Sequence, residues 1–220
     1  MFNAYSVCMV LAFLAGIAYY FYYNRGGNNE HVMTIVTWAL VCGFVGAKLP
    51  LLLEGASLIT LLTGKSIIGG LAGGMLGVYT IKRIKHIRLR IGNVIAPSVA
   101  LGMSIGRIGC YLNGCCAGIP ASWGKDFGDG ITRLPTQLFE VVFHLTAFLL
   151  LHRARGRVKT PGLLFKLYLL CYFTFRFFME YIRINPKLYW GMSVYQMLCL
   201  AGILFMLFTI HNMRKEKCYE

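Results

Sequence analysis

Acidic side chains are scarce in this sequence. Its 220 residues include only 8 aspartates and glutamates against 22 lysines and arginines, which gives a formal net charge of +14. Charged residues of both signs make up 14% of the chain, whereas 57% of it is hydrophobic. This balance is typical of a protein that crosses a membrane several times, since each spanning helix needs about 20 mostly apolar residues.

The sequence also lacks the marks of a secreted or disulfide-bonded protein. Residues 1–23 have no basic start and no small-residue cleavage site, so we expect a first membrane helix here rather than a cleaved signal peptide. The eight cysteines are scattered, mostly within apolar runs, which argues against a disulfide scaffold. We find no internal repeat, low-complexity region or soluble domain, and therefore predict one polytopic membrane domain over residues 1–220.

The basic residues gather in short clusters at 82–90, 153–159 and 214–217, between apolar runs. This distribution favours positive-inside topology over nucleic-acid binding, and anionic lipid headgroups are the expected contacts of these loops. We therefore predict an all-α integral membrane protein with its N-terminus outside and its C-terminus in the cytoplasm. About seven spans are expected, at residues 4–23, 32–53, 64–81, 94–118, 135–151, 162–182 and 192–210.

An arginine interrupts the apolar run of the fourth expected span. The stretch 102–118 reads GMSIGRIGCYLNGCCAG, with Arg107 between Gly106 and Gly109. A guanidinium at membrane depth normally faces the interior of a helix bundle or a wet cavity, and it has a partner there. The glycines allow backbone or ligand to come close. The alternative is that Arg107 only pairs with a structural carboxylate.

Two further polar patches lie in the fifth and sixth expected spans. Gln137 and Glu140 are three residues apart in the segment PTQLFE, which places them on one helix face. Arg176, Glu180 and Arg183 follow at spacings of four and three residues, so they share one stripe. Both patches are expected at the outer ends of their spans.

In the expected topology these patches and Arg107 lie at the same side of the membrane. An Arg176–Glu180 pair, and a second pair between Arg107 and Glu140, would explain part of this set as a structural network. The excess of arginines is better explained by a phosphate, which arginine binds bidentately. An anionic phospholipid headgroup is the phosphate expected at this depth.

These motifs together resemble the prolipoprotein diacylglyceryl transferase family. The family's Gly-Arg-Ile-Gly core followed by Asn-Gly is similar to residues 106–114, and its Pro-Ser/Thr-Gln-Leu-Tyr-Glu element to 135–140. Its late Arg-x-x-x-Glu-x-x-Arg element resembles 176–183, and its Gly-Gly-Leu segment resembles 69–71. The resemblance follows the family's order and covers roughly residues 40–210.

The resemblance implies a seven-span enzyme of the bacterial inner membrane. Members move diacylglyceryl from phosphatidylglycerol to the cysteine thiol of a lipobox and release glycerol phosphate, without a cofactor. The arginines would hold the phosphate and stabilise the leaving group, and a glutamate would orient them or accept a proton. The implied catalytic residues are Arg107, Glu140, Arg176 and Glu180, the implied substrate-binding residues are Gly69, Gly70, Asn113, Gln137 and Arg183, and no metal ligand is implied.

The sequence departs from the family at three positions. Ile68 and Leu134 stand where members have histidine, and Cys115 stands where an acidic residue commonly follows Asn-Gly. The chain is also shorter than typical members. These departures indicate a divergent paralogue whose acceptor is a lipobox cysteine or a related group. A catalytically inactive lipid-binding paralogue is the main alternative, and a small transporter is a second one, although paired broken helices are missing.

Cys110, Cys115 and Cys116 follow Arg107 closely and allow several interpretations. They can pack as small apolar residues at a helix end, or form a disulfide, although vicinal cysteines rarely pair with each other. A metal site that includes His144 is a weaker alternative, because the spacing matches no known zinc pattern. A covalent diacylglyceryl intermediate on Cys115 or Cys116 is another alternative.

Overall fold

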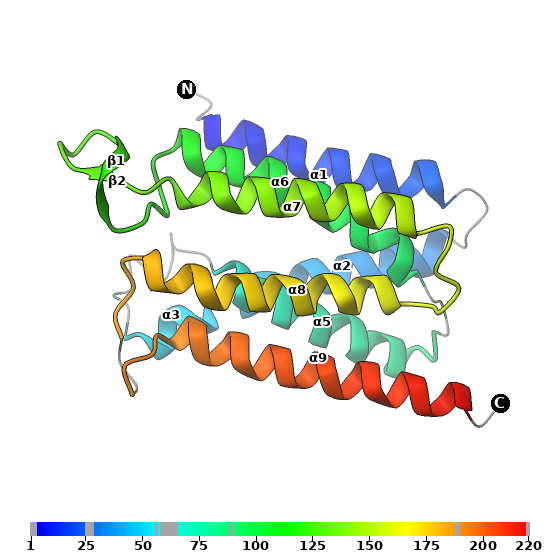
Figure 1. Ribbon diagram of the computed structural model, residues 1–220. Coiled ribbons are helices and arrows are strands. Elements are labelled where there is room, and N and C mark those ends of the chain that lie inside the picture. The colour runs from blue at the N-terminus through cyan, green and yellow to red at the C-terminus, as the bar shows by residue number, and fades with distance from the viewer. Residues whose placement is uncertain are drawn as a thin grey trace. The chain divides into compact units, whose positions relative to one another are not determined.

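The computed structural model of the chain is largely helical (Figure 1). It describes residues 4–24, 29–55, 57, 66–87, 89, 91–187 and 190–218. The helices are α1 (Ala4–Tyr23), α2 (Asn29–Gly46), α3 (Leu49–Leu53), α5 (Ile67–Ile84), α6 (Gly92–Leu112), α7 (Thr136–Ala154), α8 (Leu163–Met179), the 3-10 helix η1 (Glu180–Ile182) and α9 (Val194–Cys218). Two short strands, β1 (Pro120–Asp126) and β2 (Thr132–Arg133), lie between α6 and α7.

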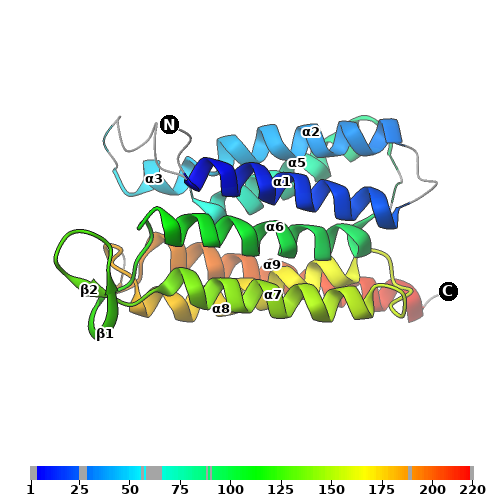
Figure 2. The same cartoon turned by 90° about the horizontal axis from the view of Figure 1, so that it is seen from above.

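The chain divides into two compact units. The first contains α1, the segment from α6 to η1 and the last part of α9, and the second contains α2, α3, α5 and the first part of α9. In the first unit α6 packs against α1, α7 and α8, and it runs alongside α7 in both views (Figures 1 and 2). The single membrane domain expected over the whole chain stays a prediction.

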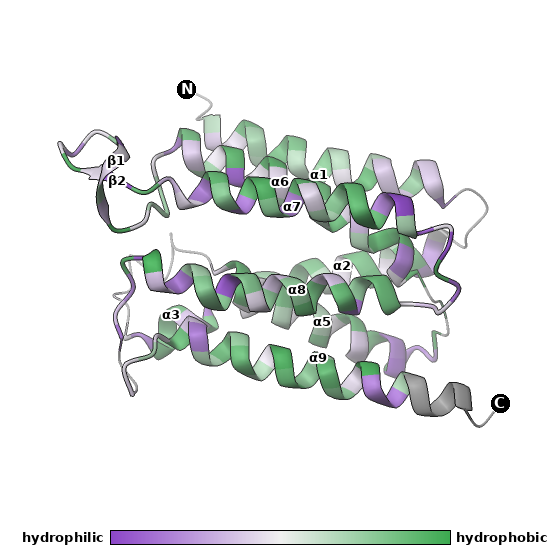
Figure 3. Ribbon diagram, viewed as in Figure 1, coloured by the Kyte–Doolittle hydropathy of each residue, from purple (hydrophilic) through white to green (hydrophobic). Residues whose placement is uncertain are grey.

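Several helices have the length and composition of membrane spans. Among the described residues, four segments are long and apolar enough to cross a membrane: Ala4–Tyr23, Glu30–Leu53, Gly92–Leu112 and Val194–Met213. This supports a helical membrane protein, whereas the expected count of seven spans and their orientation stay predictions. Helices α7 and α8 carry isolated hydrophilic positions within otherwise hydrophobic ribbons (Figure 3). The charged residues in these helices include Glu140 of α7 and Arg176 of α8.

Burial in the first unit is the reverse of that in a water-soluble protein. Large apolar side chains on α1 are exposed, such as Val10 at 56% and Leu14 at 57%. Charged side chains are buried instead, with Arg107 only 3% exposed and Glu140 fully buried. This arrangement fits a protein whose surrounding solvent is lipid, since charged residues of membrane helices face the interior of the bundle.

Glycines allow α2 and α5 to pack closely in the second unit. A Cβ atom added at Gly69 would lie 2.3 Å from the carbonyl oxygen of Gly46, and one at Gly73 would lie 2.4 Å from the carbonyl oxygen of Cys42. Only a hydrogen fits at such positions, as is common where membrane helices touch. These glycines of α5 therefore serve close packing of this helix against α2.

The span expected at 32–53 lies within the candidate membrane span Glu30–Leu53. A turn at 47–48 divides it into α2 and the short α3, which has Pro50 in its first turn, a position that suits proline. The structure corrects two of the other expected segments. The helix expected to reach Gly118 ends at Leu112, because Gly114 and Cys116 adopt left-handed φ angles of 70° and 67°. The loop expected at 119–134 contains the antiparallel β1–β2 hairpin. Most of the loop expected at 55–65 lies outside the described residues.

Candidate active site

The short segment 118–119 forms backbone hydrogen bonds that connect the ends of three helices. The backbone N–H of Gly118 donates to Leu134 O at 2.8 Å, and that of Ile119 donates to Ile182 O at 3.0 Å. A Cβ atom at Gly118 would lie 2.6 Å from the same Ile182 oxygen, so the close approach requires glycine. These contacts join the chain after α6 to the start of α7 and to η1, at the end of the unit that carries the β1–β2 hairpin (Figure 1).

Glu140 is the centre of a buried ion-pair cluster at this junction. Its Oε2 pairs with Nη2 of Arg107, and its Oε1 accepts a hydrogen bond from Nη1 of Arg183 at 3.3 Å. The helix α7 therefore supplies a carboxylate that is shared by an arginine of α6 and one that follows η1. The Arg107–Glu140 pair weighed in the sequence analysis is present.

A second pair lies on α8 and η1. Nη1 of Arg176 is 2.6 Å from Oε2 of Glu180, and both side chains are buried. This pair adjoins Arg183, whose backbone N–H donates to Glu180 O at 3.3 Å. The structure thus brings together three arginines and two glutamates (Arg107, Arg176 and Arg183 with Glu140 and Glu180), whose formal charges sum to +3 − 2 = +1.

Some polar atoms of this cluster have no hydrogen-bond partner among the described residues. Apart from the atoms that form the ion pairs, they are Nε of Arg107, Nε of Arg183 and Oε1 of the nearby Gln137, and all three atoms are buried. Buried donors and acceptors in proteins are nearly always paired, so unpaired ones call for an explanation. Two unpaired guanidinium N–H groups in a region of net positive charge are suited to the oxygens of an anionic group.

The start of α7 is fixed to the turn that follows α6. Nε2 of Gln137 donates to the carbonyl oxygen of Cys115 at 2.7 Å, and Oγ1 of Thr136 donates to that of Cys116 at 2.7 Å. Both side chains are fully buried. Gln137, which was expected to bind substrate, therefore has a structural contact through its amide nitrogen, while its oxygen Oε1 has no hydrogen-bond partner in the described structure.

A buried aromatic group, of which the sequence pattern predicted little, lies next to the ion pairs. The hydroxyl of Tyr168 is 3.0 Å from Nδ1 of His144, which lies one turn after Glu140 on α7. Tyr172 packs against the same imidazole, with the ring centroids 4.9 Å apart. The detectable signal was the four-residue spacing of Tyr168, Tyr172 and Arg176, which places all three on one face of α8.

The remaining predicted residues lie elsewhere. Asn113 ends α6, where its backbone N–H donates to Gly109 O at 3.0 Å, and it is exposed. Gly69 and Gly70 belong to the second unit, and Gly69 donates its N–H to the capping Ser66 side chain at 3.2 Å. The binding roles expected for these three residues stay predictions.

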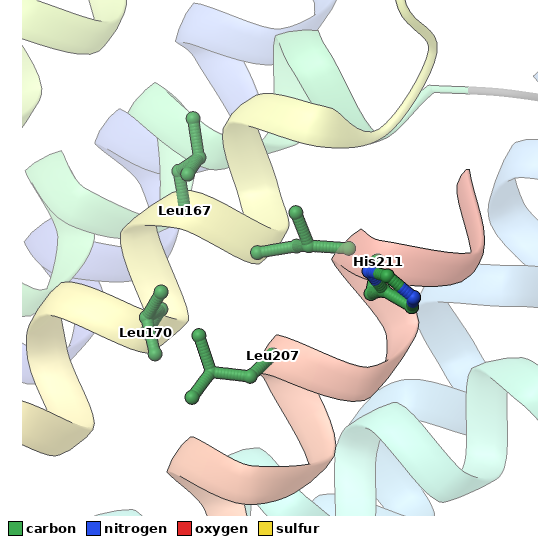
Figure 4. A pocket seen from close by; sticks show the side chains of 5 residues that line it. Leu167, Leu170, Leu207 and His211 are labelled. Carbon is green, nitrogen blue, oxygen red and sulfur yellow. The ribbon is translucent and has the colours of Figure 1, made fainter. Parts of the chain in front are cut away.

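An apolar pocket lies between α8 and the last part of α9 (Figure 4). It has a volume of about 400 Å³ and is lined by Leu167, Leu170, Leu207, Ile210 and His211. None of the predicted site residues lines it. His211 is the one titratable residue among these five, and no arginine or lysine among them could bind a phosphate, so the ion-pair cluster is the better candidate for the active site.

Comparison with known proteins identifies the family. The family model of prolipoprotein diacylglyceryl transferase matches residues 1–211. A phosphatidylglycerol–prolipoprotein diacylglyceryl transferase of Dehalococcoides mccartyi is 28% identical over 97% of this chain and 90% of its own length. An enzyme of the same name from Clostridium tetani is 31% identical over 88% of this chain and 86% of its own length. The chain therefore belongs to the prolipoprotein diacylglyceryl transferase family, as its three polar motifs predicted.

Proposed function

We propose that this chain transfers the diacylglyceryl group of phosphatidylglycerol to a cysteine thiol of a prolipoprotein and releases glycerol phosphate. The names of its relatives state the donor, the transferred group and the acceptor. The observation that carries the proposal is the buried cluster in which Arg107 and Arg183 both contact Glu140. The unpaired Nε atoms of these arginines supply donors for a phosphate diester.

The reaction requires a displacement at carbon. The acceptor's thiolate sulfur forms a bond to the glyceryl carbon that carries the phosphate ester, and the C–O bond to the phosphate breaks. The electron pair of that bond stays on the phosphate oxygen, so negative charge grows on the leaving glycerol phosphate. Arg107 and Arg176 are assigned to stabilise this charge, because fixed cations in a site that excludes water act strongly on developing charge.

The thiol proton needs an acceptor, and two carboxylates are available. Glu140 contacts two arginines, so we assign it the role of orienting them. Glu180 pairs with Arg176 and is assigned the role of proton acceptor. In this proposal the two glutamates take over the role of the family's histidines. The residues at those two positions, Ile68 and Leu134, are buried and hydrophobic and have no titratable group.

The proposal places the site on the outer side of a bacterial inner membrane. Seven spans with the N-terminus outside and the C-terminus in the cytoplasm put the basic clusters at 82–90, 153–159 and 214–217 inside. The junction that joins α6, α7 and η1 then lies outside, where a phospholipid headgroup and a translocated protein both have access. The whole chain would form one membrane domain.

The experiment is a transfer assay with purified protein in detergent, phosphatidylglycerol and a lipobox peptide. Glycerol phosphate release and the mass of the peptide are measured together. A diacylglyceryl mass gain that equals the released glycerol phosphate supports the proposal. Release without a gain would mean a different acceptor, and no release would favour an inactive lipid-binding protein. Arg107→Ala tests the cluster, and the exposed Arg153 at the end of α7 provides the matched control Arg153→Ala.

A further inference from the structure

Three cysteine thiols meet at the end of α6. The Sγ atoms of Cys110, Cys115 and Cys116 all lie within 4.8 Å of one another. Cys110 is buried, while Cys115 and Cys116 are partly exposed, so the cluster has one open side. The proposed transferase chemistry uses none of these side chains. We propose that the three thiols bind one soft d10 metal cation, of the class of Zn²⁺ or Cu⁺.

The local backbone explains why residues at this spacing come together. The helix α6 ends at Leu112, and the chain then turns back so that the N–H of Cys115 donates to Cys110 O at 3.2 Å. Cys116 holds a φ angle of 67°, which is uncommon for any residue other than glycine and often marks a functional constraint. A regular helix would have separated Cys110 from Cys115, because residues five apart do not share a face.

Hydrogen bonds from α7 also fix the turn that carries Cys115 and Cys116, so the position of these cysteines does not depend on a bound metal. Side chains at the start of α7 bind the carbonyl oxygens of Cys115 and Cys116, each at 2.7 Å. Such fixed backbone contacts orient the ligands before the ion arrives, as supporting groups do in metal sites. The family resemblance implied no metal ligand, and a metal site at these cysteines was a weaker alternative because their spacing matches no known zinc pattern. The turn supplies the proximity that the spacing does not reveal.

The chemistry of the ligands selects the class of ion. Three thiolates and no oxygen or imidazole ligand favour soft cations, since thiolate sulfur selects Cu⁺ and Zn²⁺ over hard cations such as Mg²⁺ or Ca²⁺. A Zn–S bond of about 2.3 Å in a tetrahedral site puts two sulfurs about 3.8 Å apart. The thiols therefore need to move by less than about 1 Å to coordinate one ion.

The positive charge of the neighbouring ion-pair cluster also favours three thiolates bound to a cation. Binding releases the thiol protons to solvent and leaves three thiolates around a cation, so the complex carries net negative charge. Arg107 lies one turn before Cys110 on α6 and belongs to a cluster with net positive charge. Zn²⁺ would take a solvent molecule as its fourth ligand at the open side, whereas Cu⁺ is satisfied by three sulfurs.

Metal titration of the full-length protein tests this proposal. The protein is purified in detergent, reduced, freed of metal with a chelator and titrated separately with Zn²⁺ and with Cu⁺ against a chromophoric competitor. Bound metal is counted by mass spectrometry, and X-ray absorption gives the number of sulfur ligands. We expect one ion per chain with three sulfurs, and the metal that binds with this stoichiometry identifies the occupant.

Single substitutions separate the cluster from the other thiols. Cys115→Ser and Cys116→Ser, at partly exposed positions, should each weaken binding at least about 100-fold, since even outer-shell changes cost about 10–100-fold. Cys171→Ser is the control, because Cys171 is an exposed thiol on α8 outside the cluster. The proposal is overturned by the absence of stoichiometric binding, by a disulfide within the cluster in the unreduced protein, or by equal loss of binding in Cys171→Ser.

Discussion

Nη1 of Arg183 lies 3.3 Å from Oε1 of Glu140, although 43 residues separate them in the sequence. The two residues belong to different segments, since Glu140 lies in α7 and Arg183 follows η1. Arg107 approaches the other oxygen of the same carboxylate from α6. One fully buried carboxylate therefore holds two arginines in place, and it leaves their Nε atoms unpaired.

Replacement of Arg107 by alanine should lower the rate of glycerol phosphate release by about 10²–10³-fold, the usual loss when one fixed donor to a developing charge is removed. Arg107→Lys should recover little of the lost release rate, because lysine offers no planar pair of donors to a phosphate. Turnover is measured with phosphatidylglycerol and a lipobox peptide, and detergent-solubilised yield shows whether the variant reaches the membrane. Full activity of a folded Arg107→Ala protein would remove this residue from the site.

Glu140→Gln should affect binding and turnover in opposite directions. The change raises the formal charge of the cluster from +1 to +2, so an anionic phospholipid should bind more tightly and the KM for phosphatidylglycerol should fall. The arginines lose the carboxylate that orients them, so kcat should fall by about 10²-fold. Steady-state kinetics separate the two parameters. A raised KM with unchanged kcat would mean that Glu140 contacts the substrate instead of orienting the arginines.

Gly69→Ala and Gly70→Ala distinguish helix packing from substrate binding. A Cβ atom at Gly69 would lie 2.3 Å from a backbone oxygen, whereas one at Gly70 meets nothing closer than 3.5 Å. Gly69→Ala should therefore lower the free energy of unfolding by about 1–3 kcal/mol, the usual cost of overpacking. Gly70→Ala should change it by less than about 0.5 kcal/mol. Thermal unfolding in detergent measures both.

The activity of the stable Gly70→Ala protein then tests the second role. A large loss of transferase activity at normal stability would support substrate binding at this glycine. Unchanged activity would restrict its role to packing against α2, where Gly43 is its nearest backbone neighbour.

The β1–β2 hairpin should contain a carboxyl group that titrates at unusually low pH. A hydrogen bond from the Arg133 side chain, together with the backbone N–H of Ile131, holds the pKa of Asp129 below its ordinary value of about 3.9. The ion pair therefore contributes to hairpin stability above pH about 4 and is lost as the pH falls further, through the lowered pKa. The amide resonance of Ile131 should report this titration by NMR, and Asp129→Asn should abolish it. A midpoint at or above the ordinary value would contradict the assignment.

The sequence alone predicted the family and the residues of the ion-pair cluster. Charged residues are so costly in apolar helices that each one stands out in the sequence, and the spacing of Arg176 and Glu180 on one helix face already implied their contact. The same reasoning assigned the polar motifs to one side of the membrane. The helices α1 and α9 were also predicted from the sequence, because long apolar runs can be recognised without tertiary information.

The tertiary structure decided which partners meet and where helices end. That Glu140 is shared by Arg107 and Arg183 depends on the backbone contacts of Gly118 and Ile119, which join segments far apart in the chain. The meeting of three thiols depends on a left-handed turn at Cys116, which local propensity does not predict for cysteine. Such features arise from packing between segments, so periodicity and composition, which describe one segment at a time, do not contain them.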